Sequence, residues 1–290
     1  MASTPPVNTI STFTARNKYM SANMQEILKA SLIAEKICAV DRSDTYTIQN
    51  PYGSTPSVSI TSLTGTYAIT AFTTTDDALT VDMEVKYGEH IYDFNKIISN
   101  FDLFAERADR LAYSVAQKID YAIVNLLCEA GTGTYSTPSG GFTTAANWNK
   151  ILSNLLTKWA GYSNIYDGMF LVVEAGDLAG IVEAQMTNGF SFADAALNNG
   201  FVKNQAGIDI YCVIDSTFAD DTIGTTSVTN DGHRVAGIKR AATFAFPRGV
   251  QYEEKAVGEK TGKEVVVWGT FGFKLWTQMA TMIIDITVTA

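Results

Sequence analysis

The amino-acid sequence predicts an α+β fold, in which helices and strands occupy separate parts of the chain. Three observations lead to this prediction. Residues 80–87 alternate between apolar and polar side chains, which is typical of a strand with one solvated face. Apolar residues recur at steps of three or four from about residue 95 to 130, as in a long amphipathic helix. The chain after residue 238 consists of short strand-like apolar runs.

The N-terminal third predicts an arm, a short helix and a β-hairpin. Residues 1–20 are rich in Thr, Asn and Pro without periodicity, so we expect an extended arm. A capping box of Asn23 and Glu26 predicts a short helix after it. Residues 45–79 contain no Lys, Arg or Glu, alternate weakly, and are broken by Pro and Gly. We interpret them as a long hairpin that leads into the one-sided strand at 80–87.

The middle of the chain predicts a compact α/β unit after the long helix. Gly131 ends that helix, and GTGTYSTPSGG (131–141) is expected to be a flexible connector. A broad apolar stripe predicts a second helix over 147–160. A buried strand (169–173), a helix (178–185), a long loop and a second buried strand (208–214) follow. A polar, turn-rich segment then precedes strands expected at 238–246, 250–254, 265–268 and 283–288.

Composition excludes several functional classes. Only 18% of the 290 residues are charged, below the roughly 25% of average proteins, whereas 46% are apolar. The net charge of -9 argues against tight nucleic-acid binding and against docking on an anionic membrane. No apolar run approaches the ~18 residues of a membrane span, and the first twenty residues do not resemble a signal peptide. We therefore expect synthesis and folding in a cytoplasm.

No catalytic, cofactor-binding or metal-binding residues are expected, so an enzyme is not predicted. Cys38, Cys128 and Cys212 lie among apolar neighbours without CxxC spacing, which favours buried reduced thiols. The two histidines, His90 and His233, are too few for a triad or a three-histidine zinc site, and structural roles are favoured. The 131–141 loop lacks the GK[ST] ending of a phosphate loop. The acidic doublets at 76–77 and 220–221 lack calcium-loop spacing and are interpreted as solvated turns.

The order of these elements resembles the major capsid proteins of tailed bacteriophages, with the Hong Kong 97-type fold, over nearly the whole chain. The phrase GMFLVVEAGDLAGIVEAQ is similar to a strand and helix of that family, and Gly207–Tyr211 to a short strand that follows a loop. GIKRAATFAFPRGVQYEE and WGTFGFKLW resemble its late strands. The resemblance implies an N-terminal arm and short helix (1–40), an extended β-hairpin or E-loop (41–94), a P domain with a spine helix (95–145), an A domain (146–240) and return strands of the P domain (241–290).

The function implied by the resemblance is assembly. Copies of the chain would form hexamers and pentamers that close into an icosahedral shell around double-stranded DNA, bound without sequence specificity. Further partners would be a portal, a separate scaffolding protein and a decoration or cement protein. The virion would be the location, after assembly in the host cytoplasm. Candidate contacts between subunits are Val58, Ile60, Tyr67, Ile69, Val81, Met83, Val85, Arg107 and Arg110.

Two departures and three alternatives accompany this interpretation. Some members join subunits by an isopeptide bond from an E-loop lysine, but residues 45–79 hold no lysine and only Lys86 lies near the base, so we expect no cross-link. Few residues precede the first helix, so we expect little or no N-terminal cleavage. The alternatives are an encapsulin-type cellular compartment, a Thr-rich secreted or surface β-protein, and an enzyme with an unfamiliar site.

Overall fold

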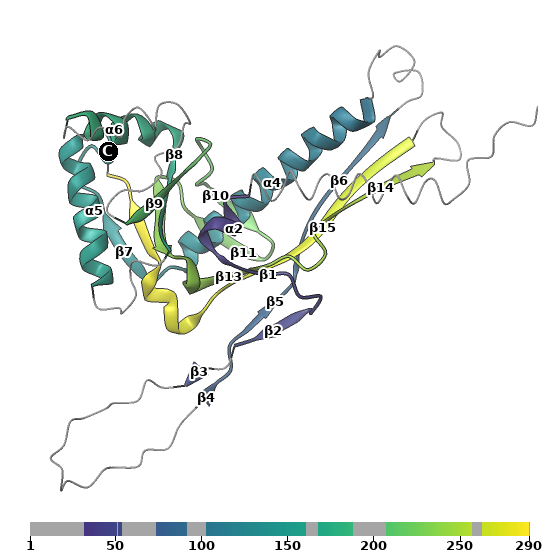
Figure 1. Ribbon diagram of the computed structural model, residues 1–290, viewed down its shortest axis with the longest axis horizontal. Coiled ribbons are helices and arrows are strands. Elements are labelled where there is room, and N and C mark those ends of the chain that lie inside the picture. Colours follow the sequence, from purple (N-terminus) through teal and green to yellow (C-terminus); the bar gives the residue numbers. More distant parts are fainter. Residues whose placement is uncertain are drawn as a thin grey trace, which may run out of the picture.

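The computed structural model describes residues 32–50, 52–53, 74–91, 103–160, 168–187, 207–256 and 263–289 (Figure 1). Its helices are α2 (Ala34–Ile37), α4 (Leu103–Ala130), α5 (Ala145–Trp159) and α6 (Ala175–Thr187), with 3-10 turns η1 (Lys239–Ala241) and η2 (Thr277–Met282). Its strands are β1 (Ala39–Asp41), β2 (Thr47–Gln49), β3 (Tyr52–Gly53), β4 (Thr74–Thr75), β5 (Ala78–Thr80), β6 (Met83–Ile91), β7 (Gly133–Ser136), β8 (Met169–Glu174), β9 (Ile208–Val213), β10 (Asp220–Ile223), β11 (Thr226–Thr229), β12 (His233–Ile238), β13 (Ala242–Ala245), β14 (Val250–Ala256), β15 (Lys263–Leu275) and β16 (Ile284–Thr287). The described chain contains both helices and strands, in agreement with the predicted α+β class, although they alternate between β6 and β9.

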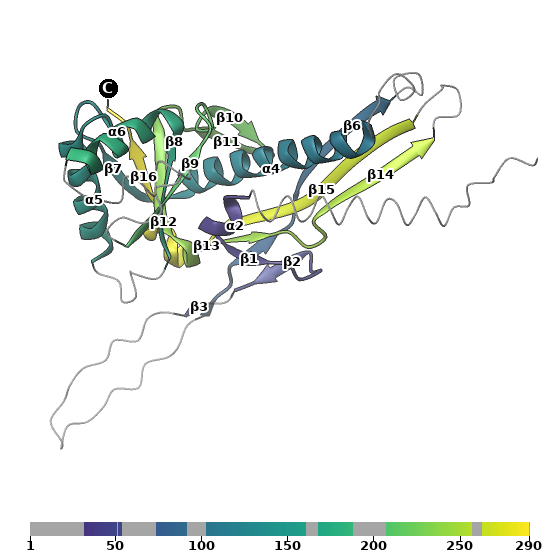
Figure 2. The same cartoon turned by 45° about the horizontal axis from the view of Figure 1, so that its top comes forward.

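A compact unit is built on a five-stranded sheet with the order β7-β16-β12-β8-β9. The sequence of β8 does not alternate between apolar and polar residues, because both faces of the sheet are covered at this strand. Met169, Leu171 and Val173 pack in the cluster formed with α5 and α6, whereas Phe170 and Val172 belong to the cluster that includes α4. The sheet is therefore a middle layer, and the helices α5 and α6 lie on its other side from α4 (Figures 1 and 2).

An elongated sheet extends away from the compact unit alongside the first half of α4 (Figures 1 and 2). Its central strand β15 pairs antiparallel with β14 and β6 over its first part and with β13 over its last part. Buried and partly exposed residues alternate along β15, and Val265, Val267 and Phe271 point into the core. The apolar run predicted a strand at 265–268, whereas β15 continues to Leu275 through the stretch WGTFGFKLW, which the resemblance interpreted as a closing turn and strand.

The helix α4 joins the two sheets into one hydrophobic core. Its buried residues Leu111, Val115, Ile119 and Ala122 recur at helical spacing, as predicted. They belong to one cluster with residues of the elongated sheet and of the compact unit. The predicted start of the helix near residue 95 falls in 92–102, outside the described residues, and the described helix begins at Leu103.

The predicted hairpin before β6 is represented by its base. The strands β2 and β5 pair antiparallel, with Ile48 opposite Leu79, and β3 pairs with β4 further out. These pairs leave the body in a different direction from the elongated sheet (Figure 1). The expected alternation then holds from Val81 to Lys86, although the chain changes from β5 to β6 between Thr80 and Met83.

Several sequence interpretations are corrected. The connector expected at 131–141 contains β7, which pairs in parallel with β16, and the strand expected at 238–246 is divided by η1 into β12 and β13. The turn-rich segment before β12 contains the hairpin of β10 and β11. Asp77, expected in a solvated turn, is buried, and its carboxylate accepts hydrogen bonds from the backbone and hydroxyl of Thr277 and pairs with Lys274. For β7 and Asp77, contacts between positions distant in sequence decided a conformation that the local sequence left open.

The expectations that fall outside the described residues stay predictions. They are the N-terminal arm with the helix start at Asn23, the hairpin tip (54–73) and the long loop before β9 (188–206). None of the described helices is long and apolar enough to cross a membrane.

Gly272 is the point of closest approach between β15 and the base of the hairpin. A Cβ added there would lie 2.5 Å from the carbonyl oxygen of Thr80 and 3.0 Å from the Cα of Val81. We predict that Gly272→Ala lowers the free energy of unfolding by about 1–3 kcal/mol, because backbone atoms must shift. The matched control is Gly88→Ala on β6, where an added Cβ has nothing within 4 Å. Urea unfolding followed by tryptophan fluorescence compares them, and equal effects of the two substitutions would contradict the prediction.

The buried carboxylate of Asp120 fixes the segment before β1 to α4. It accepts hydrogen bonds from the backbone N–H groups of Ile33 (3.0 Å) and Ala34 (2.8 Å). Burial raises the pKa of Asp120 from 3.8 to about 6, although these two hydrogen bonds and nearby Lys36 act in the opposite direction and Glu35 adds to the rise. The folded chain therefore binds this proton more tightly than the unfolded chain. The associated stabilisation is complete below pH 3.8 and is lost as the pH rises through about 6.

We predict that lowering the pH from 7 to 4.5 adds about 2 kcal/mol to the free energy of unfolding through Asp120. Asp120→Asn removes this gain, because an amide does not titrate. Asp44→Asn, at a carboxylate whose side chain is 70% exposed, serves as the control and keeps the gain. Urea midpoints at both pH values measure the effect. A pH dependence that is the same in wild type and Asp120→Asn would show that the proton is bound elsewhere.

Candidate functional site

The described residues place only part of the predicted contact set. Val58, Ile60, Tyr67 and Ile69 lie outside the described residues. Arg107 lies in α4, but its side chain is also outside the description, whereas Arg110 on the same helix is exposed to solvent. For these residues a contact with a neighbouring subunit therefore stays a prediction from the sequence. The structure adds only that Arg110 is exposed.

Val81, Met83 and Val85 face this chain's own interior. Val81 is 6% exposed and packs with Leu79 and Trp276, while Met83 and Val85 are half-buried against the main core. The sequence showed correctly that one face of this strand is apolar, but it could not show what covers that face. The structure corrects the expectation for Val81 in particular, because its side chain retains almost no area for a second subunit.

Exposed aromatic and aliphatic side chains that the sequence reasoning missed lie elsewhere. Tyr113 is one turn beyond Arg110 on the outer surface of α4 and is 52% exposed, and Ile214, just after β9, is 57% exposed. Both line a small pocket of about 140 Å³ between α4 and β9. Tyrosine and arginine are enriched at protein interfaces. Arg110 and Tyr113 thus place an exposed arginine and an exposed tyrosine one turn apart on the same helix.

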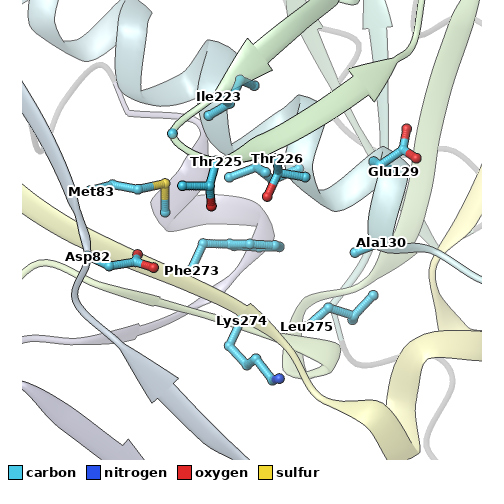
Figure 3. Close-up of a pocket in the computed structure, with 12 residues that line it drawn as sticks. Asp82, Met83, Glu129, Ala130, Ile223, Thr225, Thr226, Phe273, Lys274 and Leu275 are labelled. Carbon is cyan, nitrogen blue, oxygen red and sulfur yellow. The ribbon is translucent and has the colours of Figure 1, made fainter.

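A pocket of about 430 Å³ lies between the end of α4, the β10–β11 turn and the elongated sheet (Figure 3). Asp82 and Met83 at the start of β6 form one wall, and the β10–β11 turn and Glu129 form another. Lys274 also lines the pocket, and the ammonium group of Lys274 lies 3.0 Å from the carboxylate of Asp77. Figure 3 shows these charged groups at the rim and Phe273 between them. The side chains thus stabilise the junction of elements.

The ionisable groups of the compact unit serve mainly as structural ties. Arg234 is buried and pairs with Glu174 (2.8 Å) and Asp177, and its guanidinium lies 5.3 Å from the ring centroid of Phe218. This network connects β12, β8 and α6. A buried cation with two carboxylates is compensated in charge, and removal of one partner would leave an unpaired charge.

The cysteines have the properties of structural thiols. Burial raises the pKa of Cys38 to about 12, and burial together with the carboxylate of Asp285 raises that of Cys128 further. Because the thiolate is the nucleophilic form, both groups are poor nucleophiles at neutral pH. Cys212 is only partly buried, contrary to the expectation of full burial.

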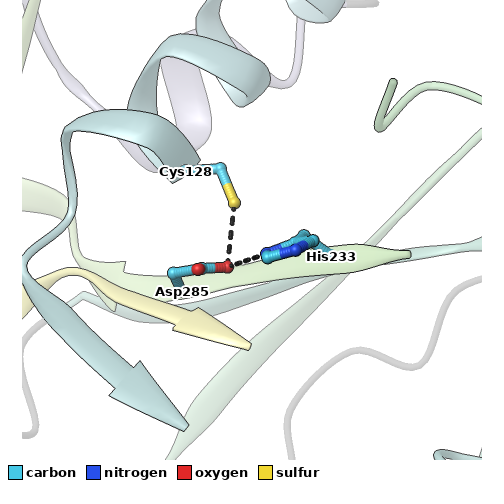
Figure 4. A group of neighbouring side chains, drawn as sticks. All are labelled: Cys128, His233 and Asp285. Carbon is cyan, nitrogen blue, oxygen red and sulfur yellow. Dashed lines mark hydrogen bonds and ion pairs between the residues drawn. The ribbon is translucent and has the colours of Figure 1, made fainter. Parts of the chain in front are cut away.

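One group of potential metal ligands was not foreseen. Cys128, His233 and Asp285 place one sulfur, nitrogen or oxygen atom each within 4.8 Å of one another (Figure 4). The sequence gave no signal for this group, because each residue belongs to a different element and 157 positions separate Cys128 from Asp285. Zinc motifs are found in sequence by short spacings, and none exists here.

No protein-family model matches the chain, and no curated protein matches it at significant similarity. Solved structures do. The capsid of cyanophage P-SCSP1u is 14% identical, with a TM-score of 0.67 over 89% of this chain and 88% of the other. The mature capsid of bacteriophage PhiM1 is 11% identical, with a TM-score of 0.64 over 89% and 87%. A virus-like particle from Pyrococcus furiosus is 7% identical, with a TM-score of 0.61 over 93% and 99%.

Identities this low establish the fold alone, but they do so over nearly the full length of both partners. The similarity therefore does not depend on a single common motif such as one helix against one sheet. The chain has an α+β fold shared with the capsid proteins of tailed bacteriophages, as its resemblance to the Hong Kong 97-type family led us to expect.

Proposed function

We propose that the chain is the major capsid protein of a tailed bacteriophage. Copies of it form hexamers and pentamers, and these close into an icosahedral shell around double-stranded DNA. The observation that supports the proposal most directly is a fold shared with phage capsids over 88–89% of both chains. No catalytic role is proposed: the buried ionisable groups Arg234 and Asp120 take part in structural ion pairs and hydrogen bonds.

We also propose a correspondence between the described elements and the domains of the family. The hairpin base of β2 to β5 corresponds to the E-loop (41–94), and α4 corresponds to the spine helix of the P domain (95–145). The segment with α5, α6 and β8 to β12 corresponds to the proposed A domain (146–240), and β13 to β16 correspond to the proposed return strands (241–290), although β7 and β16 pair within the compact sheet. Subunit contacts are assigned to the exposed outer surface of α4 and to the hairpin.

The charge balance suits a container for DNA. A net charge of -9 disfavours adhesion of phosphate to the protein, since such binding depends on clustered cations. Packed DNA would therefore meet the shell without sequence-specific contacts. A portal, a scaffolding protein and a decoration or cement protein complete the proposed partners, and the virion is the proposed location after assembly in the host cytoplasm.

An encapsulin-type compartment shell is the second candidate. The observation that favours it is the match to the Pyrococcus furiosus particle, which covers 93% of this chain and 99% of the other. Its TM-score of 0.61 is lower than the 0.67 of the cyanophage capsid. The two functions differ in contents, because a phage shell encloses DNA and a cellular compartment encloses protein cargo.

We predict that the full chain, expressed alone or with a scaffolding protein, forms closed shells or rings of five and six subunits. Negative-stain electron microscopy and light scattering measure this. Nuclease-protected double-stranded DNA in particles from infected cells would support the phage assignment, and a defined protein cargo would support the compartment. A stable monomer under every condition would contradict both assignments.

We predict that Arg110→Glu lowers the yield of assembled particles at least tenfold while the chain remains folded. The substitution reverses the charge at an exposed position of α4 near Tyr113. The new carboxylate opposes docking of a neighbouring subunit, because it either meets a negative group or loses its hydration in the contact. The matched control is Lys150→Glu on the exposed face of α5, which changes the net charge equally. Sedimentation measures particle yield and circular dichroism measures folding. Equal yields from the two variants would remove α4 from the proposed interface.

A further inference from the structure

The last turn of α4 meets the compact sheet at three polar side chains. Cys128 projects from the helix, His233 from the start of β12 and Asp285 from β16 (Figure 4). The thiol of Cys128 donates to Oδ1 of Asp285 at 3.3 Å, and Nδ1 of His233 lies 2.7 Å from the same oxygen. These three side chains lie beside a second polar contact, in which Asn230 donates a hydrogen bond to the buried Asn125 of α4.

The strand register explains why His233 and Asp285 meet. The strands β12 and β16 are antiparallel, and Val235 lies opposite Asp285. His233 is two residues before Val235, so it lies on the same face of the sheet and diagonally opposite Asp285. Val235 packs in the cluster that contains α4, which identifies this face as the one that the helix covers. The positions of the His233 and Asp285 side chains are thus fixed by backbone pairing between two strands and do not depend on a loop.

We propose that Cys128, His233 and Asp285 form a binding site for a zinc-type divalent metal ion. Thiolate, imidazole and carboxylate are all established zinc ligands, and three protein ligands leave one position for water or another oxygen. The proposal concerns this chain's own side chains and does not depend on the function proposed above.

The distances are close to those that the metal requires. In a tetrahedral zinc site, bond lengths of about 2.0–2.3 Å separate neighbouring ligand atoms by roughly 3.2–3.6 Å. The sulfur–oxygen distance of 3.3 Å falls in that range, and the nitrogen–oxygen distance of 2.7 Å must widen by about half an ångström. A rotation of the partly exposed His233 ring provides this change without movement of the strands.

Charge and access also suit a zinc-type ion. Metal binding displaces the proton of the Cys128 thiol, and the resulting thiolate and the carboxylate carry two negative charges that balance a divalent cation, while the imidazole binds in its neutral form. The side chains of His233 and Asp285 are 24% and 21% exposed, so an ion can enter from solvent, whereas Cys128 is 2% exposed and shielded from oxidants. Magnesium and calcium prefer all-oxygen sites, so a set with sulfur and nitrogen disfavours them.

The bound metal would connect three elements that are distant in sequence. It would fix the end of α4 to two neighbouring strands of the compact sheet. A ligand that binds only the folded chain stabilises it in proportion to the logarithm of ligand concentration over Kd. The expected consequence is a higher unfolding temperature with the metal than without it.

The test uses the full chain without an affinity tag, freed of metal by a chelator and then titrated with Co²⁺ and with Zn²⁺. We expect one ion per chain, a thiolate-to-cobalt charge-transfer band that Zn²⁺ abolishes, and a rise in the unfolding midpoint with Zn²⁺. Cys128→Ser should abolish the band and the rise. Cys212→Ser, which removes a different free thiol, should retain both.

His233→Gln guards against a variant that fails to fold, because this side chain is partly exposed and lies at the start of its strand. We expect its affinity for Co²⁺ to fall at least tenfold while its circular dichroism spectrum stays that of the wild type. The proposal is overturned if the wild type shows no charge-transfer band, or if Cys128→Ser or folded His233→Gln binds as the wild type does.

Discussion

The packing of one helix against two sheets is the constraint on which the structure depends. α4 contributes to a single core that contains residues of the elongated sheet, such as Val267 and Phe271, and residues of the compact sheet, such as Val172 and Val235. A helix of 28 residues is about 42 Å long, enough to span both. The apolar stripe of α4 must therefore pack against two different sheets. A change in the direction of the helix would remove its contact with one of them.

The strand β15 connects the two ends of the elongated sheet. Its first residues pair with β14 and β6, and its last residues pair with β13, so the same strand serves the extended part and the part near the compact unit. The change of partner occurs between Gly269 and Gly272, and at Gly272 the neighbouring backbone comes so close that a side chain would collide. Glycine is usually unfavourable within a strand, and here its small size allows the crossing.

The sequence predicted the elements whose side chains report their surroundings. α4 and α5 were found because their apolar periodicity is strong, and β8 and β9 because both faces of each strand are buried. β7 was missed because GTYS has little apolar character, and pairing with β16 makes it a strand. The burial of Val81 and the meeting of Cys128 with Asp285 depend on tertiary contacts between distant positions. No local pattern contains that information.

The elongated sheet also shows how the chain limits unwanted pairing. Within the described residues, β6 and β14 flank β15 and form its two edges, and exposed strand edges are sites of uncontrolled association. Each edge carries a Glu and a Lys two residues apart on one face: Glu84 with Lys86 and Glu253 with Lys255, each pair at 3.3 Å. The opposite face holds the buried residues Tyr252 and Val267. The charged side chains on the open face restrict where a neighbour can dock. A protein that assembles in a defined geometry needs this restriction, because its surfaces must accept one arrangement of copies and reject the others.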